Sequence, residues 1–234
     1  MKNYDVTALG ELLIDFTESG ISSQGNPLLE ANPGGAPCNV LAMLSKLGKR
    51  TAFIGKVGAD MFGRQLAETI NEVGICTDGL MTDASVPTTL AFVHTFADGE
   101  REFSFVRNPG ADMMLTKQEV RTDLIRDSKI FHFGTLSSTH AGVREATRFA
   151  IDIAIESGAM LSFDPNLREP LWKNLEDAKT EIEYGVSKCN LLKILDNEVE
   201  FLFGHSDYDR AARELLEKYP QIQLICITLG GNGS

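Results

Sequence analysis

Hydrophobic positions along the chain follow two alternating periods. Short β-rich apolar runs predict strands at residues 4–9, 51–57, 129–133, 160–163, 190–195 and 223–228. Between them, apolar residues recur at three- and four-residue spacing, which is typical of helices; two such stripes end at Gly48 and Gly74, and longer helices are expected over 141–156 and 207–218. This alternation predicts an α/β fold, in which a mostly parallel central sheet carries helices on both faces.

One segment departs from this alternation. Residues 88–97 and 100–107 are two strand-like runs joined by Asp98-Gly99, a strong hairpin signal. Segments 12–16 and 28–31 are short enough to join the hairpin. We therefore expect one domain over residues 1–234, with a small β lid whose strands come from about 12–31 and 88–107. An ordinary edge hairpin of the main sheet is the alternative. The lid would be rich in phenylalanine: Phe92, Phe96, Phe103 and Phe105.

Composition narrows the class of protein. The hydrophobic and charged fractions, 43% and 24%, are those of an ordinary globular protein. The net charge of −11 argues against a nucleic-acid partner, although a nucleotide cofactor needs only a few local donors. The four cysteines form no CxxC pair, which favours thiols in a reducing compartment. Apolar runs fall short of the ~18 residues of a membrane span. We expect a cytoplasmic protein with no nucleic-acid or membrane partner.

The first candidate for chemistry is the run of residues 32–39, which leads directly into a predicted helix. The adjacent glycines Gly34 and Gly35 would let a ligand approach the backbone closely, next to the free N–H groups of the helix. The Asn39 amide offers both a donor and an acceptor. Taken by itself, a Gly-Gly pair before a helix is also a common tight turn, so both interpretations stay open here.

Several familiar sites are missing from the sequence. Residues 58–63 have the glycine spacing of a phosphate-binding P-loop, but Arg64-Gln65 stands where Lys and Ser/Thr are required. No GxGxxG follows the first strand, and no GxSxG elbow occurs. The four histidines lack metal-ligand spacing, which favours structural roles. Glu11 and Asp15 would suit a paired-carboxylate glycosidase, but any acidic chain offers such pairs by chance.

Longer patterns point to one family. Residues 34–48, GGAPCNVLAMLSKLG, and 53–63, FIGKVGADMFG, resemble the first signature of the PfkB, or ribokinase-like, carbohydrate kinases. Residues 10–16, GELLIDF, look like that family's opening strand. Residues 163–172, FDPNLREPLW, are similar to its fructokinase branch, and 228–233, TLGGNG, to its nucleotide-side turn. The resemblance runs through the whole chain and implies a ribokinase-like fold with a lid.

The resemblance also implies an activity: ATP-dependent phosphorylation of a sugar hydroxyl with Mg²⁺, fructose being the expected sugar. Other substrates in the family are 2-keto-3-deoxygluconate, ribose and nucleosides, and a non-catalytic sugar-binding protein on the same fold is a further alternative. The apolar lid predicts a homodimer in which two lids pack together.

The resemblance assigns residue roles. Glu198 would act on Mg²⁺ through water, although Leu195 stands where the family has an asparagine. Arg107 would bring a charged donor over the sugar, and Phe103 or Phe105 would form an apolar wall. The residues expected to bind nucleotide are Lys193, Thr228, Gly230 and Gly233. Those expected to bind sugar are Asp15, Gly34, Gly35, Asn39, Phe103, Phe105, Arg107, Asn166 and Arg168.

One family feature does not occur. The second signature, a Gly-Ala-Gly-Asp turn with the catalytic aspartate, is absent from residues 1–234, and the resemblance places it after Ser234. We therefore expect no catalytic base within these residues and little turnover by this chain alone.

Overall fold

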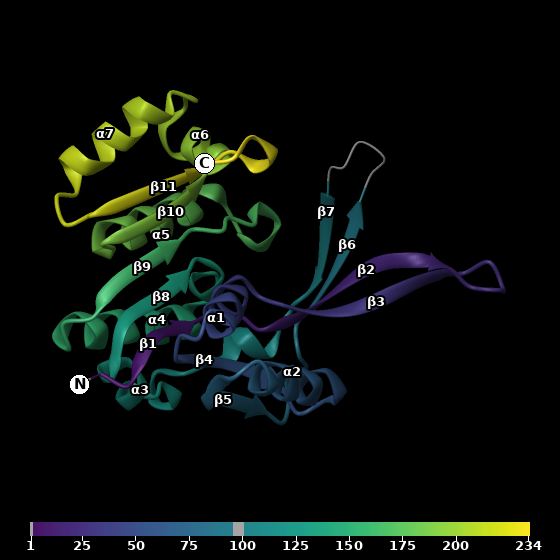
Figure 1. The fold of residues 1–234 in the computed structure, drawn as a ribbon. Helices are drawn as coiled ribbons and strands as arrows, with labels where there is room; N and C mark the ends of the chain where they lie inside the picture. The colour runs from purple at the N-terminus through teal and green to yellow at the C-terminus, as the bar shows by residue number, and fades with distance from the viewer. Residues whose placement is uncertain (1, 96–100) are drawn as a thin grey trace.

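A computed structural model describes residues 2–95 and 101–234, and within them the strands form two sheets (Figure 1). The large sheet has seven described strands, all parallel, in the order β11-β10-β9-β8-β1-β4-β5. The small sheet has the order β3-β2-β6-β7, with β2 and β6 parallel and the other two pairs antiparallel. The predicted α/β class with a mostly parallel central sheet is confirmed.

The large sheet consists of β1 Tyr4–Leu9, β4 Thr51–Gly58, β5 Ile75–Asp83, β8 Ser128–Gly134, β9 Met160–Asp164, β10 Leu191–Leu195 and β11 Leu224–Thr228. The small sheet consists of β2 Leu13–Ile21, β3 Pro27–Gly34, β6 Leu90–Thr95 and β7 Arg101–Val106. The helices are α1 Ala36–Lys46, α2 Met61–Glu72, α3 Thr122–Arg126, α4 Ala141–Glu156, α5 Leu175–Lys188, α6 Asp196–Phe203 and α7 Tyr208–Lys218.

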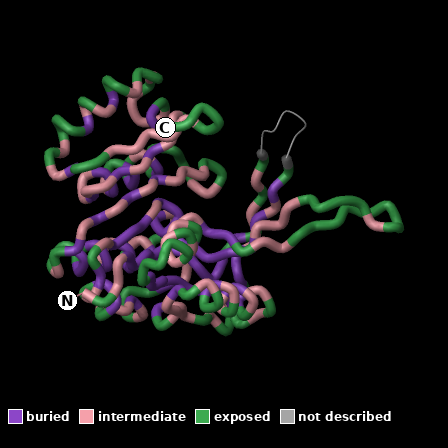
Figure 2. Tube along the Cα trace, viewed as in Figure 1, coloured by how far each residue is buried: buried purple, intermediate pink, exposed green. Residues whose placement is uncertain are grey.

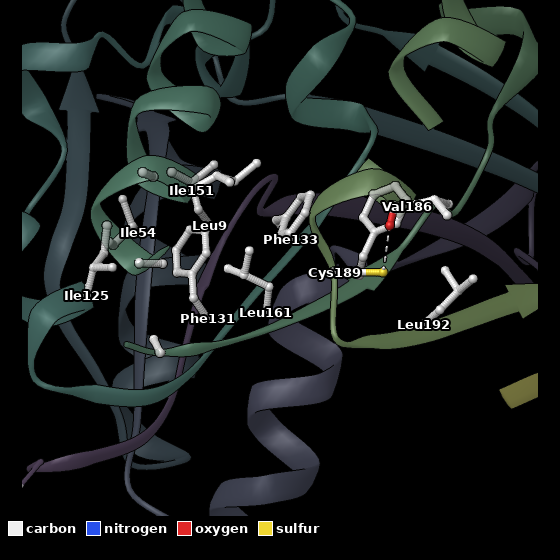
Figure 3. Close-up of a cluster of buried hydrophobic side chains, with 14 of the residues drawn as sticks. Leu9, Ile54, Ile125, Phe131, Phe133, Ile151, Leu161, Val186, Cys189 and Leu192 are labelled. Atoms are coloured by element: carbon white, nitrogen blue, oxygen red, sulfur yellow. Dashed lines mark hydrogen bonds between the residues drawn. The ribbon is translucent and has the colours of Figure 1, made fainter. Parts of the chain in front are cut away.

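Each face of the large sheet has its own core, because side chains alternate across a strand. In β4, Phe53 packs on one face with Leu41 of α1 and Leu66 of α2. The next residue, Ile54, joins the opposite cluster, which includes Ala150 of α4. Helices therefore cover both faces, as predicted. Part of the second cluster is shown in Figure 3, including Leu9, Phe131, Phe133, Leu161 and Leu192.

The small sheet stands away from the large one (Figure 1). Strand β2 follows β1 after only three residues, and the far part of the β2–β3 ribbon is exposed (Figure 2), with Ile21 at 68% exposure. The expected hairpin pairing of β6 with β7 is present. Its Asp98-Gly99 turn and Phe96 lie outside the described residues. The alternative of an edge hairpin on the main sheet is excluded, because β6 pairs with β2 and β7 instead.

The base of the small sheet is fixed by the segment whose glycine spacing imitates a P-loop. The Asp60 carboxylate accepts hydrogen bonds from Gly63 N (2.8 Å), in the first turn of α2, and from Thr88 N (2.7 Å), which precedes β6. Gly58 N in turn donates to Thr88 Oγ1 at 3.0 Å. This glycine segment therefore has an architectural role: it joins α2 to the start of β6.

Strand β5 and helices α3, α5 and α6 were not predicted by the hydrophobic pattern. Strand β5, at one edge of the described sheet, carries only two buried residues, Ile75 and Gly79, so its sequence lacks a continuous apolar run. Helix α5 buries Glu181 along with its aliphatic stripe, which weakens the helical pattern. The buried Glu181 is paired with Arg148 at 2.8 Å.

Candidate functional site

An open cavity of about 120 Å³ lies where the carboxyl end of the large sheet meets the small sheet. Parallel strands of α/β proteins place ligands at this edge. All of the expected sugar-binding residues except Gly34 and Arg107 line the cavity. Its lining consists of Glu11, Leu13, Asp15, Gly35, Ala36, Asn39, Phe103, Phe105, Leu136, Asn166 and Arg168.

Asp15 is the acidic group on the small-sheet side of the cavity. Burial raises the pKa of its carboxyl, and the positive charge of Arg168 opposes that shift. Gly34 lies beside it on β3: a Cβ atom at this position would overlap Asp15 Oδ2. Gly34 therefore does not line the cavity but leaves the space that the Asp15 carboxylate occupies.

Glu11 lines the cavity, although from the sequence it was considered only as half of a chance carboxylate pair with Asp15 and was not assigned to the sugar site. Its side chain is buried, and Oε1 accepts a hydrogen bond of 2.8 Å from Ala36 N in the first turn of α1. Burial raises the pKa of Glu11 to about 7. A Cβ on Gly35, whose φ is 122°, would meet the Glu11 carbonyl oxygen. The Ala36 N–H, at the start of α1, therefore donates to Glu11 instead of facing a ligand as expected. The position of Glu11, two residues after the first strand, was the sequence signal that could have identified it.

The loop after β9 forms the opposite side of the cavity. Asn166 has a left-handed backbone with φ of 47°, and its N–H donates to Asp164 Oδ1 at 3.2 Å. The next N–H, of Leu167, donates to Glu198 Oε1 at 2.7 Å. The Arg168 guanidinium lies over the Phe103 ring, 5.3 Å from its centre. Arg168 therefore connects the loop to the aromatic wall of the small sheet, where Phe103 stacks on Phe105.

The structure does not place Arg107 in the cavity lining, where it was expected to reach over the sugar. Its side chain is buried, and Nη2 lies 2.7 Å from Asp112 Oδ2. Nε donates to Asp112 Oδ2 (2.8 Å), Nη1 donates to Thr139 Oγ1 (2.8 Å), and Nη2 also donates to the Leu136 carbonyl (3.0 Å). The physical reason is Asp112, five residues farther along the chain, which neutralises the guanidinium and holds it outside the lining. Arg107 ties the end of β7 to the segment after β8.

The expected nucleotide residues belong to β10 (Lys193), to the carboxyl end of β11 (Thr228) and to the turn that follows β11 (Gly230 and Gly233). These two strands are paired, with Leu195 opposite Thr228. Thr228 Oγ1 is buried and has no hydrogen-bond partner in the described chain. Gly230 and Gly233, with φ of 58° and 93°, shape the turn that follows. An unpartnered buried hydroxyl beside an open glycine turn fits the polar groups of a nucleotide such as ATP.

The residues expected near Mg²⁺ do not form a ready cation site. Within residues 2–95 and 101–234, no three His, Cys, Asp or Glu side chains are grouped so as to hold a metal ion. Both oxygens of Glu198 already accept backbone N–H groups, from Leu167 (2.7 Å) and Leu195 (2.8 Å). Lys193 Nζ lies 3.3 Å from Asp164 Oδ1, so a cation already neutralises the neighbouring carboxylate. The role of Glu198 in binding Mg²⁺ stays a prediction.

Other candidate groups serve the fold. His132 is buried and bonded to Ser162 Oγ at 3.0 Å, and burial lowers the pKa of its imidazole. The four cysteines are free thiols. No helix in the described part of the chain is long and apolar enough to cross a membrane.

Comparison with known proteins places this geometry in a family. The sequence model of the family described as "pfkB family carbohydrate kinase" matches residues 4–234. The chain is 44% identical to fructokinase-2 of Solanum habrochaites over 230 residues, covering 97% of this chain and 70% of that protein. It is 45% identical to probable fructokinase-2 of Arabidopsis thaliana, with the same coverage of each.

Solved structures agree with the sequence comparison. A fructokinase from Xylella fastidiosa superposes with a TM-score of 0.86 at 32% identity, covering 97% of this chain and 70% of that one. A fructokinase double mutant from Vibrio cholerae, with fructose, ADP and potassium ion bound, gives 0.85 at 28% identity, covering 98% and 72%. The chain belongs to the PfkB family of carbohydrate kinases.

Proposed function

We propose that the protein transfers the γ-phosphoryl group of ATP to a hydroxyl of fructose. The observation that carries the proposal is the convergence of Asp15 from β2, Asn39 from α1, and Asn166 and Arg168 from the loop after β9 on one cavity. Relatives named fructokinases supply the choice of sugar: one solved fructokinase structure has ATP bound, and another has fructose and ADP bound.

The cavity residues suit a sugar in chemical terms. A carboxylate such as Asp15 accepts hydrogen bonds from hydroxyl groups, and the amides of Asn39 and Asn166 can donate and accept. Arg168 donates from the opposite side. Phe103 and Phe105 offer an apolar wall against which the C–H face of a sugar ring packs. Orientation of the sugar hydroxyl toward the phosphate donor is the main contribution that such a cradle makes to phosphoryl transfer.

The nucleotide would lie against Thr228, Gly230, Gly233 and Lys193, next to the sugar. ATP supplies the phosphoryl group when bound. Thr228 Oγ1 would gain the partner that it lacks in the described chain, and Lys193 would offset phosphate charge. We propose that Mg²⁺ arrives with the ATP phosphates rather than in a preformed protein site, as is usual for this ion.

Calorimetric titration tests the proposal. We expect fructose to bind more tightly than ribose, 2-keto-3-deoxygluconate or a nucleoside, and a non-hydrolysable ATP analogue to bind as well. Preference for another of these sugars would reassign the substrate within the family. Fructose binding without any nucleotide binding would instead support a non-catalytic sugar-binding protein. A coupled ADP-release assay with the preferred sugar then measures transfer.

We also propose that the small sheet acts as a lid and pairs with a second copy in a cytoplasmic homodimer. The support is the exposed apolar surface of the β2–β3 ribbon: Ile21 is 68% exposed, and Leu28 and Leu29 are each 46% exposed. Light scattering should give a dimer at micromolar concentration. Leu29→Glu should yield monomer, whereas Leu216→Glu on α7, an equally exposed leucine, should not. A monomeric unmodified protein would exclude the dimer.

A further inference from the structure

We propose that Glu198 is a positioning residue of the sugar site, acting from the nucleotide side through the backbone of the Asn166–Arg168 loop. This inference rests on the proposed function, because it assumes that the loop contacts the sugar. It differs from a role in holding Mg²⁺ through water, and the two roles give opposite results in one measurement described below.

The geometry of Glu198 shows how it connects two parts of the site. The residue is 1% exposed, in the first turn of α6. Oε2 accepts from Leu195 N at 2.8 Å, which satisfies a helix N-terminal donor in the way common for a glutamate at this position. Oε1 accepts from Leu167 N at 2.7 Å, 31 residues away in the sequence. Only the second bond crosses from β10–α6 to the loop after β9.

The loop needs such support because its backbone is unusual. Asn166 adopts φ of 47°, a region that costs free energy for residues other than glycine and persists where the surroundings hold it. Leu167, whose N–H Glu198 binds, lies between Asn166 and Arg168. Each of these neighbours lines the cavity. A shift of the Leu167 N–H would therefore move both sugar-facing side chains together.

Other hydrogen bonds restrain the start of the loop, where Thr135 N also donates to the Pro165 carbonyl (3.2 Å), and its end, where Leu171 N donates to the Arg168 carbonyl (3.0 Å), but not Leu167 N. Asp164 Oδ1 accepts from Asn166 N at 3.2 Å, and Thr135 Oγ1 donates to the Pro165 carbonyl at 2.6 Å. Glu198 is the group recorded on Leu167 N, directly before Arg168. The Arg168 guanidinium then reaches the Phe103 ring. Loss of the hydrogen bond between Glu198 and Leu167 N should displace Arg168 more than the other residues of the loop.

A carboxylate is required because two donors converge on one side chain. Glutamine at position 198 has one carbonyl oxygen and one NH₂ group, so one of the two backbone N–H groups would face another donor. A buried N–H without an acceptor is costly, and the loop can avoid that cost only by moving. Aspartate keeps the charge but is one methylene shorter, so it can stay near Leu195 N while losing reach to Leu167 N.

The deciding experiment is calorimetric titration of fructose into the full chain with EDTA present and no nucleotide. We expect Glu198→Gln and Glu198→Asp each to weaken fructose binding at least about tenfold, since misplacement of contact residues has effects of this size. The control is Asp207→Asn, which removes the same charge from the N-cap of α7, and it should leave fructose affinity unchanged. A residue acting only through Mg²⁺ would leave fructose affinity unchanged in EDTA, which would overturn the inference.

A double-mutant cycle with Arg168→Ala separates positioning from general loss of stability. If Glu198 acts by placing Arg168, Glu198→Gln should weaken fructose binding much less in the Arg168→Ala background than in the unmodified protein. Equal effects in both backgrounds would overturn the inference. If Glu198→Gln does not fold by circular dichroism, Glu198→Asp decides alone. Absence of fructose binding by the unmodified protein would instead overturn the proposed function.

Discussion

Gly34 and Asp15 form one structural unit: the carboxylate of Asp15 occupies the space that a side chain on residue 34 would fill. The two residues belong to paired strands, β3 and β2, at the point where the small sheet meets the cavity. The missing side chain on one strand is what allows a charged group on the other to line the cavity.

Gly34→Ala should therefore weaken fructose binding by displacing the Asp15 carboxylate. We expect a loss of roughly tenfold or more, the effect of one charge-assisted hydrogen bond. Gly48→Ala is the control: it adds the same methyl at a site with nothing within 4 Å, where φ of 75° makes the change strained but remote. Calorimetry with fructose checks both, and equal affinities in the two variants would contradict the proposed contact.

Asp15→Asn should reduce fructose affinity roughly 10- to 100-fold, because an ionised acceptor becomes a neutral amide. Glu18→Gln, on the same strand but exposed, should change affinity little. The unfolding temperature should not fall in Asp15→Asn, since burial already raises the pKa of Asp15 and so opposes its charged form. Unchanged fructose affinity in Asp15→Asn would show that the sugar does not bind to Asp15 on β2.

Arg107→Ala should act mainly on stability. The guanidinium and Asp112 form a buried ion pair, and removing one partner of such a pair typically costs about 3–5 kcal/mol. Arg121→Ala breaks an exposed pair with Asp123 and should cost no more than about 1 kcal/mol. Urea unfolding measures both. If Arg107→Ala kept full stability but lost fructose binding, Arg107 would contact the sugar as the resemblance implies.

Glu11 should make stability fall as the pH rises. Its folded-state pKa, about 7, is above the ordinary value of 4.5, so the folded protein holds a proton that the unfolded chain releases. The stabilisation is complete below about pH 4.5 and is lost as the pH rises through about 7, an effect on the order of 3 kcal/mol.

Glu11→Gln keeps an acceptor for Ala36 N and removes the titration. Urea unfolding at pH 5 and pH 8 should therefore show a smaller decline in the variant than in the unmodified protein. The rest of the sequence, including the charged pair Arg107 and Asp112 near Glu11, is common to both proteins, so its contribution cancels in the comparison. Parallel pH profiles would show that Glu11 has an ordinary pKa.

Much of the large sheet could be predicted from the sequence, because inner strands such as β4 are buried along their whole length and several helices end at recognisable residues. Strand β1 has its predicted bounds, and Gly48 and Gly74 follow their helices with φ of 75° and 92°. Strand β5 could not be predicted, because only Ile75 and Gly79 are buried and polar residues interrupt its apolar positions. The hydrophobic pattern is informative where consecutive residues of an element are buried.

Only part of the cavity could be predicted, because a sequence motif identifies residues but does not show which charged side chains pair in the fold. Asp15, Asn39, Asn166 and Arg168 are brought together from separate motifs. Arg107 was assigned to the sugar because nothing in its motif reveals that Asp112 pairs with it. Glu11 was set aside as one of a chance pair of carboxylates, because its burial and its hydrogen bond to the start of α1 are visible only in the fold.

Asp60 couples the base of the small sheet to a helix of the main domain. Its carboxylate accepts hydrogen bonds from the first turn of α2 and from the approach to β6 at once, so the two elements are held together at their junction. The small sheet carries Asp15 and Phe103, which line the cavity, whereas Asp60 does not. A substitution at Asp60 would therefore act on the cavity from outside it, while every residue of the lining stays the same.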